Sequence, residues 1–372
     1  MAYISLGKID NTLIVILIGC VFCFLNRLLN QYDSALYKSP ILTNVCISLS
    51  RFLTVIPFII LKIRSQRVIK NKELEKKNNT NTIKLIFNDG EGNNSKGVWC
   101  AILLSAVIYL IQSIFFVYSF EVKTNSWIWY ILIAAIFYYW IFKIKLFKHH
   151  YLSIILIILI GLVIDLVTGN LQNDIINKPF ELSMKFLKEI FFSLYNVIAR
   201  YAMEKKFVSV YGFSFYIGLF NLIMLITFAL FDYYFFKWND YDEYFNKFNY
   251  IELLIIFGVV ITQLGINLTT LFTTKNNSPC HVFIIFVFGQ IAYYINFEWY
   301  APIVIICLII ILFLSLIFNE IIEINAFGLS RETKKNIMAR AVIELVEKND
   351  IDDNEIDDGD YIIELKNNEY NN

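Results

Sequence analysis

Long apolar runs, separated by short polar segments, occupy most of this chain. The hydrocarbon core of a bilayer is about 30 Å thick and is crossed by around 20 mostly apolar helical residues. The runs are continuously apolar, whereas the strands of a membrane barrel alternate apolar and polar residues. The pattern therefore predicts ten transmembrane helices, spans 1 to 10, at residues 11–29, 41–63, 98–120, 126–142, 151–167, 186–203, 210–231, 251–273, 280–294 and 301–318.

The loops between these spans alternate between rich and poor in Lys and Arg. The rich loops follow spans 2, 4 and 6, and their bases are Lys62, Arg64, Arg67, Lys70, Lys72, Lys76, Lys77, Lys84, Lys96, Lys143, Lys145, Lys148, Lys205 and Lys206. The other loops hold isolated bases such as Lys38, Lys123 and Lys178, or are acidic, as at residues 240–243. By the positive-inside rule, both termini are cytosolic, which requires an even number of spans.

Composition excludes a soluble globular protein. The apolar fraction is 58% and the mean hydropathy is +0.58, which would demand a larger core than 372 residues can enclose. The net charge is zero. We expect a lipid bilayer and a small-molecule substrate as partners and no nucleic acid, with a homodimer left open. Endomembrane and plasma membrane both remain as locations.

Two polar segments lie outside the spans. Residues 71–96 are rich in Lys, Asn and Glu and are predicted to be a disordered cytosolic linker. Residues 319–372 combine a basic amphipathic pattern around Lys334 and Leu345 with an acidic stretch, which predicts an interfacial helix and a disordered tail. A plain solvated tail is the alternative.

A short self-similarity suggests an internal repeat. Lys123-Thr124-Asn125-Ser126 closes span 3, and Lys275-Asn276-Asn277-Ser278 closes span 8, five spans later. An odd number of spans per half inserts the second half upside down, as in many secondary transporters. The predicted repeats are residues 1–168 and 169–318, although chance matches are easy in a chain rich in Asn.

Polar side chains recur at helical spacing in four spans and predict a polar cavity. The stripes are Ser105, Tyr109, Gln112 and Phe116; Glu189, Ser193, Asn196 and Arg200; Gln263, Asn267, Thr270 and Thr274; and Gln290, Tyr293 and Tyr294. For each residue alone, a bond to a neighbouring helix is an alternative to substrate contact. Tyr138 in span 4 either stacks on a substrate or belongs to an interfacial belt.

Arg51 lies about ten residues into span 2, near the bilayer midplane. Such a charge is costly there unless it is paired, hydrated or functional. It is either an anchor for an anionic substrate or a packing residue bonded to carbonyls or a carboxylate. We expect Arg27 and Arg200 to reach the headgroups. Asp165 and Glu189 are expected to be hydrated, with proton-coupling carboxylates as the alternative.

The chain offers little for catalysis, metals or cofactors. His149 and His150 follow three lysines, and nothing nearby in sequence supplies further metal ligands. Cys20 and Cys23 lie in span 1 without a His or acidic partner there. No Walker-type loop is present. We expect no catalytic residue, no metal and no cofactor.

Two stretches carry a family resemblance: Ser39-Pro40-Ile41 with Ser50-Arg51-Phe52-Leu53, and the basic junction 143–150 with Ile160-Gly161-Leu162-Val163-Ile164. They resemble the EamA-type domain of the drug/metabolite transporter superfamily, with the solute carrier 35 group the most similar eukaryotic branch. That family usually has a Glu near the junction, whereas this chain has Lys143 and Lys145. The resemblance implies ten helices, in two inverted repeats, around a central substrate cavity.

The sequence thus predicts an all-α membrane protein that is a secondary transporter of a small polar metabolite, with nucleotide-sugar-like anions among the candidates. The predicted substrate-binding residues are Arg51, Tyr109, Gln112, Tyr138, Asn196, Gln263, Asn267, Gln290 and Tyr294. The alternatives are a membrane-embedded transferase acting on lipid-linked substrates and a non-transporting receptor or scaffold. The transferase needs converging catalytic groups, which the three histidines do not supply in sequence.

Overall fold

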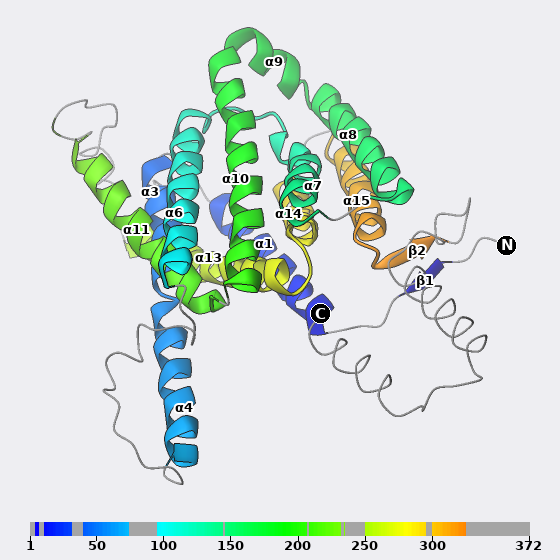
Figure 1. The fold of residues 1–372 in the computed structure, drawn as a ribbon. Coiled ribbons are helices and arrows are strands. Elements are labelled where there is room, and N and C mark those ends of the chain that lie inside the picture. Colours follow the sequence, from blue (N-terminus) through cyan, green and yellow to red (C-terminus); the bar gives the residue numbers. More distant parts are fainter. Residues whose placement is uncertain are drawn as a thin grey trace, which may run out of the picture. The chain divides into compact units, whose positions relative to one another are not determined.

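The computed structural model describes residues 4–6, 11–31, 40–73, 95–143, 146–206, 208–231, 234, 250–294 and 300–324. The predicted linker, except for its ends, and the predicted tail helix lie outside these residues. The described residues are almost entirely helical (Figure 1), so the all-α class is confirmed.

A helical segment coincides with every predicted span. The helices are α1 (Asn11–Gln31), α3 (Pro40–Phe52), α4 (Val55–Glu73), α6 (Ser95–Tyr118), η1 (Ser126–Ile128), α7 (Trp129–Phe142), α8 (Lys148–Thr168), α9 (Asn170–Asn177), α10 (Pro179–Lys205), α11 (Val210–Phe231), α13 (Tyr250–Asn276), η3 (Pro279–His281), α14 (Val282–Tyr293) and α15 (Ala301–Phe318).

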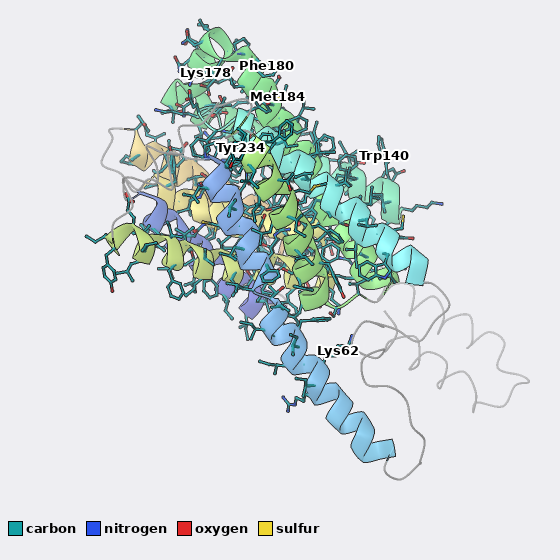
Figure 2. The ribbon with its side chains drawn as sticks, turned by 90° about the vertical axis from the view of Figure 1, so that its left-hand side faces the viewer. Lys62, Trp140, Lys178, Phe180, Met184 and Tyr234 are labelled. Atoms are coloured by element: carbon teal, nitrogen blue, oxygen red, sulfur yellow. The ribbon has the colours of Figure 1, made fainter. Side chains whose placement is uncertain are left out.

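Six helical segments of the described residues are long and apolar enough to cross a membrane: Pro40–Arg64, Gly97–Tyr118, Lys148–Thr168, Val210–Phe231, Tyr250–Asn276 and Ala301–Phe318. Three further apolar segments are shorter. Many large apolar side chains point outward, among them Ile60, Phe257, Ile306 and Trp140, the last labelled in Figure 2. Because a soluble surface rarely exposes so much apolar area, the chain is a membrane-spanning protein.

The chain divides into two units. In the first, residues 1–6 and 322–372, strand β1 (Ile4–Leu6) pairs antiparallel with β2 (Ile322–Ile324). The second unit, Gly7–Ile321, contains all the helices of the described residues.

Within the second unit, the long helices pack on helices distant in sequence. α1 lies along α13 and α14, and α10 lies along α6 and α7. α3 packs on α11 and α13, α11 also packs on α6, and α8 packs on α15. The core is therefore built from contacts between the two predicted halves.

Span 2 is broken near its middle, between α3 and α4. Pro57 has no N–H, and its ring collides with the carbonyl four residues earlier, that of Leu53. The Leu53 carbonyl instead accepts from Ile56 N at 3.2 Å, and Thr54 N donates to the Arg51 carbonyl at 3.1 Å. The Thr54 hydroxyl donates to the same Arg51 carbonyl at 2.6 Å. The break thus lies at Leu53 and Thr54, just beyond Arg51 and Phe52.

Candidate functional site

Arg51 is held between two tyrosines inside the bundle. Its Nη1 donates to the Tyr195 hydroxyl at 2.7 Å, and its Cζ lies 3.9 Å from the ring centroid of Tyr109 and 5.0 Å from that of Tyr195. Arg51 is 5% exposed, and both tyrosines are buried. A guanidinium over a desolvated aromatic face is a favourable cation–π contact. We call these three residues the Arg51 cluster.

The local sequence explains this position. Arg51 is at the end of α3, where the helix breaks, and Gly218 of α11 presses against that backbone. A Cβ added at Gly218 would lie 2.4 Å from Phe52 N and 2.8 Å from the Arg51 carbonyl carbon. Only glycine allows two backbones to approach so closely. Next to this close contact, the Arg51 side chain reaches Tyr109 of α6 and Tyr195 of α10.

The charge of Arg51 has no counter-ion in the part of the chain that the structure describes: none of the ion pairs there includes it. Its Nε has no hydrogen-bond partner among the described residues. The sequence suggested that Arg51 bonds carbonyls or a carboxylate. Among the described residues, its side chain bonds the Tyr195 hydroxyl instead. A buried, unneutralised cation costs several kcal/mol, so an anion that enters the cluster gains strong attraction.

Further polar atoms near these residues in sequence are buried without a hydrogen-bond partner. They include Gln112 Oε1 on α6, three residues after Tyr109, and Ser48 Oγ, three residues before Arg51. Residues three apart share a helix face. Buried polar groups are normally satisfied by protein, water or ligand, so these faces favour a hydrated or ligand-binding interior.

Most members of the polar stripes lie in the interior, although Tyr293 is 37% exposed, and several members bond neighbouring helices. Gln263 Oε1 accepts from Asn26 Nδ2 at 3.1 Å, and Asn267 Nδ2 donates to the Ser50 hydroxyl at 2.8 Å. Asn196 is fully buried and its Nδ2 donates to Phe192 O in its own helix at 3.1 Å. Gln263 and Asn267 therefore fasten α13 to α1 and α3, whatever else they contact.

Arg200 organises a second polar group, which includes Tyr138. Its Nε pairs with Glu204 at 2.8 Å, Nη1 donates to the Thr274 carbonyl at 3.4 Å, and Cζ lies 5.2 Å from the Tyr138 ring. The Arg200 side chain is 14% exposed. Arg200 thus ties the end of α10 to α7 and α13, and the expectation that it reaches the headgroups stays a prediction.

Two carboxylates hold the segment that joins α6 to η1. Asp165 Oδ1 accepts from Asn125 N at 3.0 Å and from Asn125 Nδ2 at 2.7 Å. Asp174 Oδ2 accepts from Lys123 N, from Thr124 N and from the Thr124 hydroxyl at 3.0, 2.8 and 2.6 Å. The repeat motif of the first half is thus a clamped turn.

A third carboxylate, that of Glu189, contacts the same segment. Glu189 pairs with Lys188 at 2.8 Å and accepts from the Ser126 hydroxyl at 3.2 Å. Asp165 and Glu189 are 5% and 3% exposed, so the expectation that they are hydrated is wrong. At the exposed Lys178, seen in Figure 2, the hydrogen bond to Glu121 raises the lysine pKa above its ordinary value.

The two remaining predicted residues lie on span 9. Tyr294 donates to Asn125 Oδ1 at 3.0 Å and is 6% exposed, and Gln290 of α14 is 9% exposed. Both lie in the interior, but neither contacts Arg51 in any described interaction. The predicted residues are therefore spread along the interior and do not form one compact site.

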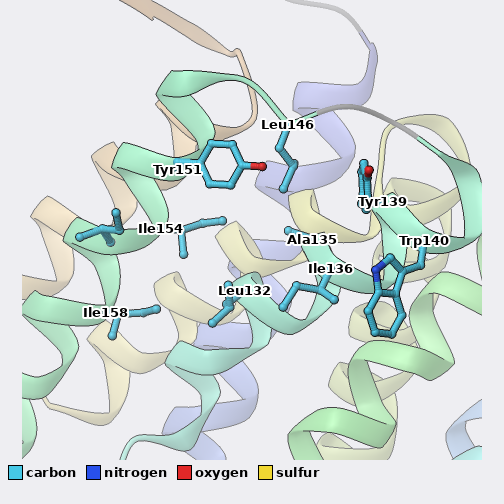
Figure 3. A pocket seen from close by; sticks show the side chains of 10 residues that line it. Leu132, Ala135, Ile136, Tyr139, Trp140, Leu146, Tyr151, Ile154 and Ile158 are labelled. Carbon is cyan, nitrogen blue, oxygen red and sulfur yellow. The ribbon is translucent and has the colours of Figure 1, made fainter.

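A cavity of about 380 Å³ lies elsewhere, between α7 and α8 (Figure 3). Its lining is Leu132, Ala135, Ile136, Tyr139, Trp140, Leu146, Tyr151, Ile154, Ile155 and Ile158. Substrate sites combine apolar walls with a few convergent polar groups. This lining offers little polar surface, and the exposed Trp140 and Tyr151 place it on the outer face, so it is not the polar site predicted from the sequence.

The chain matches no known protein family and no curated protein sequence.

Tyr195 and Gly218 were not predicted, because an aromatic or a glycine in an apolar run carries no signal of its partner. The expectation that no third ligand lies near His149 and His150 does not hold, since Glu320 is next to them in space.

Proposed function

We propose that this protein is a secondary transporter that carries a small, polar, anionic metabolite by alternating access, without covalent chemistry. The observation that carries the proposal is Arg51, a buried cation with no carboxylate partner among the described residues, at a helix break. Broken helices at depth in a membrane protein are typical of transporter binding sites. The guanidinium can bind a phosphate or carboxylate through two parallel hydrogen bonds.

Helix packing supports two inverted five-span repeats. In two five-span repeats, each helix corresponds to the helix five spans later. The packing of α1 on α13 and α14 then corresponds to the packing of α10 on α6 and α7. α3 with α11 and α8 with α15 are pairs that the shift maps onto themselves. Both copies of the repeat motif lead into a 3₁₀ turn, η1 or η3. Such a plan needs all ten helices to be spans, including the charged α10, and agrees with the proposed membership of the drug/metabolite transporter superfamily.

The two halves also differ in one informative contact. α10 packs on α13, where Arg200 reaches Thr274, whereas the pair related by the five-span shift, α1 and α6, shows no comparable packing along its described length. In alternating access, one end is closed while the other is open. The Arg200 group is accordingly the closed gate, at the end that carries Lys205 and Lys206 and that we assign to the cytosol.

Opening of this gate can be followed by the reactivity of a native cysteine, Cys280, which lies in η3 and is 3% exposed. We expect Arg200→Gln to raise the rate at which an impermeant thiol reagent modifies Cys280 by about tenfold, the effect of about 1.4 kcal/mol. The measurement uses the Cys100→Ser/Cys307→Ser background. Lys206→Gln, two residues beyond Glu204 and in none of the ion pairs of the described residues, is the control and should leave the rate unchanged. Equal rates in both variants contradict the gate.

The proposed orientation, with both termini in the cytosol, has a test by glycosylation. The sequons Asn78-Asn79-Thr80 and Asn93-Asn94-Ser95 lie in the loop assigned to the cytosol and should remain unmodified in cells. Tyr241→Thr completes a sequon at Asn239, in a loop assigned to the opposite side, and provides the control. We expect a glycosidase-sensitive mass shift for Tyr241→Thr only. A shift in the unaltered chain would invert the orientation.

Transport itself is tested by reconstituting the full chain into sealed vesicles and offering pooled metabolites that carry phosphate, carboxylate or no charge. We expect saturable uptake of one or more anionic compounds above that of protein-free vesicles. Uptake restricted to neutral or cationic compounds contradicts the anion site. The absence of any saturable uptake by folded protein favours the receptor or scaffold alternative.

A further inference from the structure

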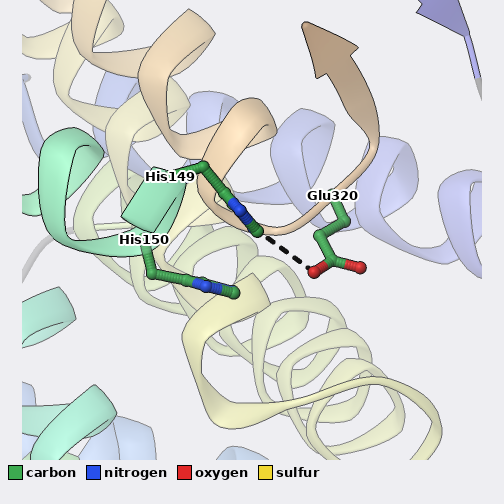
Figure 4. Close-up of side chains that lie close together, drawn as sticks. All are labelled: His149, His150 and Glu320. Carbon is green, nitrogen blue, oxygen red and sulfur yellow. Dashed lines mark ion pairs between the residues drawn. The ribbon is translucent and has the colours of Figure 1, made fainter. Parts of the chain in front are cut away.

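Three side chains converge where the start of α8 meets the end of α15 (Figure 4). They are His149, His150 and Glu320, and one potential ligand atom from each lies within 4.8 Å of the other two. His149 Nε2 is 3.3 Å from Glu320 Oε1, and the centroids of the two imidazole rings are 4.0 Å apart. This group is separate from the Arg51 cluster and has no part in the proposed transport.

The two histidines are positioned by the first turn of α8. Phe147 precedes the helix, and its backbone N–H donates to His150 Nδ1 at 3.0 Å. The His150 ring also meets Phe318 edge to face, with centroids 4.9 Å apart. Since α8 packs along α15, the histidines are brought to the end of α15 by the fold and not by their sequence neighbourhood.

Glu320 is positioned by the C-terminal cap of α15. Its N–H donates to the Ile317 carbonyl at 3.0 Å, and Ile321 N–H donates to the Leu316 carbonyl at 3.0 Å. These two bonds define a Schellman motif, whose left-handed residue is usually glycine. Here that residue is Glu320, with φ of 56°. A carboxylate therefore stands at a position whose backbone conformation favours glycine.

His149 supplies the independent observation that points to a ligand. The residue is 4% exposed, and neither ring nitrogen makes a hydrogen bond within the described part of the chain. Among the described residues, its one charged neighbour is Glu320, whose Oε1 lies 3.3 Å from His149 Nε2. A buried imidazole normally finds a hydrogen-bond partner, and a metal ion can take that place.

We propose that His149, His150 and Glu320 bind a divalent transition ion of the zinc class. Two imidazole nitrogens and one carboxylate form a known zinc ligand set, in which water takes the fourth tetrahedral position. With bonds of about 2.0–2.1 Å, tetrahedral ligand atoms lie about 3.4 Å apart. The 3.3 Å between His149 and Glu320 already matches this spacing. The ion joins the start of span 5 to the end of span 10.

His150, the third ligand, must lose a hydrogen bond before it can coordinate the ion. Because His150 Nδ1 accepts from Phe147 N–H, the neutral ring carries its hydrogen on Nε2. To coordinate, His150 must give up this bond and turn an unprotonated nitrogen toward the ion. We therefore expect loss of His150 to weaken binding less than loss of His149 or Glu320.

The test uses the full chain in detergent, titrated first with Co²⁺ and then with Zn²⁺. We expect the ligand-field absorption of tetrahedral Co²⁺ at one ion per chain and its displacement by Zn²⁺. His149→Gln and Glu320→Gln should each weaken binding by at least about tenfold, since outer-shell changes alone cost 10–100-fold. His281→Gln changes the third histidine of the chain, which bonds Ser278 instead, and should bind as wild type.

Glu320→Gly guards against misfolding, because glycine suits the positive φ at this cap. That variant should unfold at the same temperature as wild type or higher without metal, and should lose the Zn²⁺-dependent rise in melting temperature. Octahedral Co²⁺ absorption only, or binding that persists in both His149→Gln and Glu320→Gly, overturns the proposal. Neither outcome bears on transport, which depends on the Arg51 cluster.

Discussion

Arg51→Met is expected to reduce uptake at least about 100-fold, while the protein remains as stable as wild type or becomes more stable. Charge-assisted hydrogen bonds contribute about 1.5–3 kcal/mol each, so losing the guanidinium removes most of the binding energy for an anionic group. Replacing a buried charge by an apolar side chain of similar volume is often neutral or stabilising. Uptake in sealed vesicles and thermal unfolding in detergent measure the two effects.

The combination of readouts separates a substrate anchor from a packing residue. If Arg51 only packs helices, Arg51→Met should unfold at a lower temperature, and uptake should fall only in proportion to the amount of folded protein. Arg51→Lys keeps the charge but cannot make two parallel bonds and cover the Tyr109 ring together, and we expect intermediate uptake. Arg64→Met, at an exposed position of α4, is the matched control and should transport normally. Normal uptake by folded Arg51→Met contradicts the site.

Gly218→Ala is expected to destabilise the fold by about 1–3 kcal/mol, the usual cost of overpacking. The added methyl would meet backbone atoms, Phe52 N at 2.4 Å and the Arg51 carbonyl carbon at 2.8 Å, which no rotamer change can move away. Relief requires α11 to shift from α3, and this displaces Arg51 from its tyrosines. A lower unfolding temperature and reduced uptake together are the expected result.

Gly258→Ala provides the matched control for this substitution. It also lies inside a membrane-spanning helix, so both variants gain the same helix propensity, about 1 kcal/mol. Its added Cβ would meet Leu29 Cδ1 at 3.2 Å, the flexible end of a side chain. We expect Gly258→Ala to unfold at the wild-type temperature or slightly above. Equal stability of the two alanine variants would show that the close contact at Gly218 is not required.

The positions of the helices were predictable because one local quantity, continuous apolar length, decides where a chain can cross a bilayer. The predicted spans 210–231 and 301–318 coincide with α11 and α15. Span 2 was predicted whole although it is broken at Thr54, since Pro57 interrupts the backbone bonding without altering the apolar pattern. Interior-facing stripes were also predictable, because polar side chains avoid lipid.

The partners of polar residues were not predictable to the same degree. Arg51 was identified by its depth alone, but the hydroxyl of Tyr195, 144 positions away, is what it bonds. Asp165 and Glu189 were expected in water because they lie near span ends, and the fold encloses them instead. Each of these outcomes depends on which helices become neighbours, and apolar periodicity does not encode that choice.

Taken by itself, the sequence determined that this chain lies in a membrane as a set of helices, and which faces of those helices are polar. Burying apolar length in lipid depends only on residues close together in the chain. The tertiary structure decided that Arg51 meets tyrosines and, among the described residues, no counter-ion, that Gly218 presses on its backbone, and that Glu320 joins two histidines. Those contacts join residues far apart in sequence, and they form only when helices from distant parts of the chain pack together.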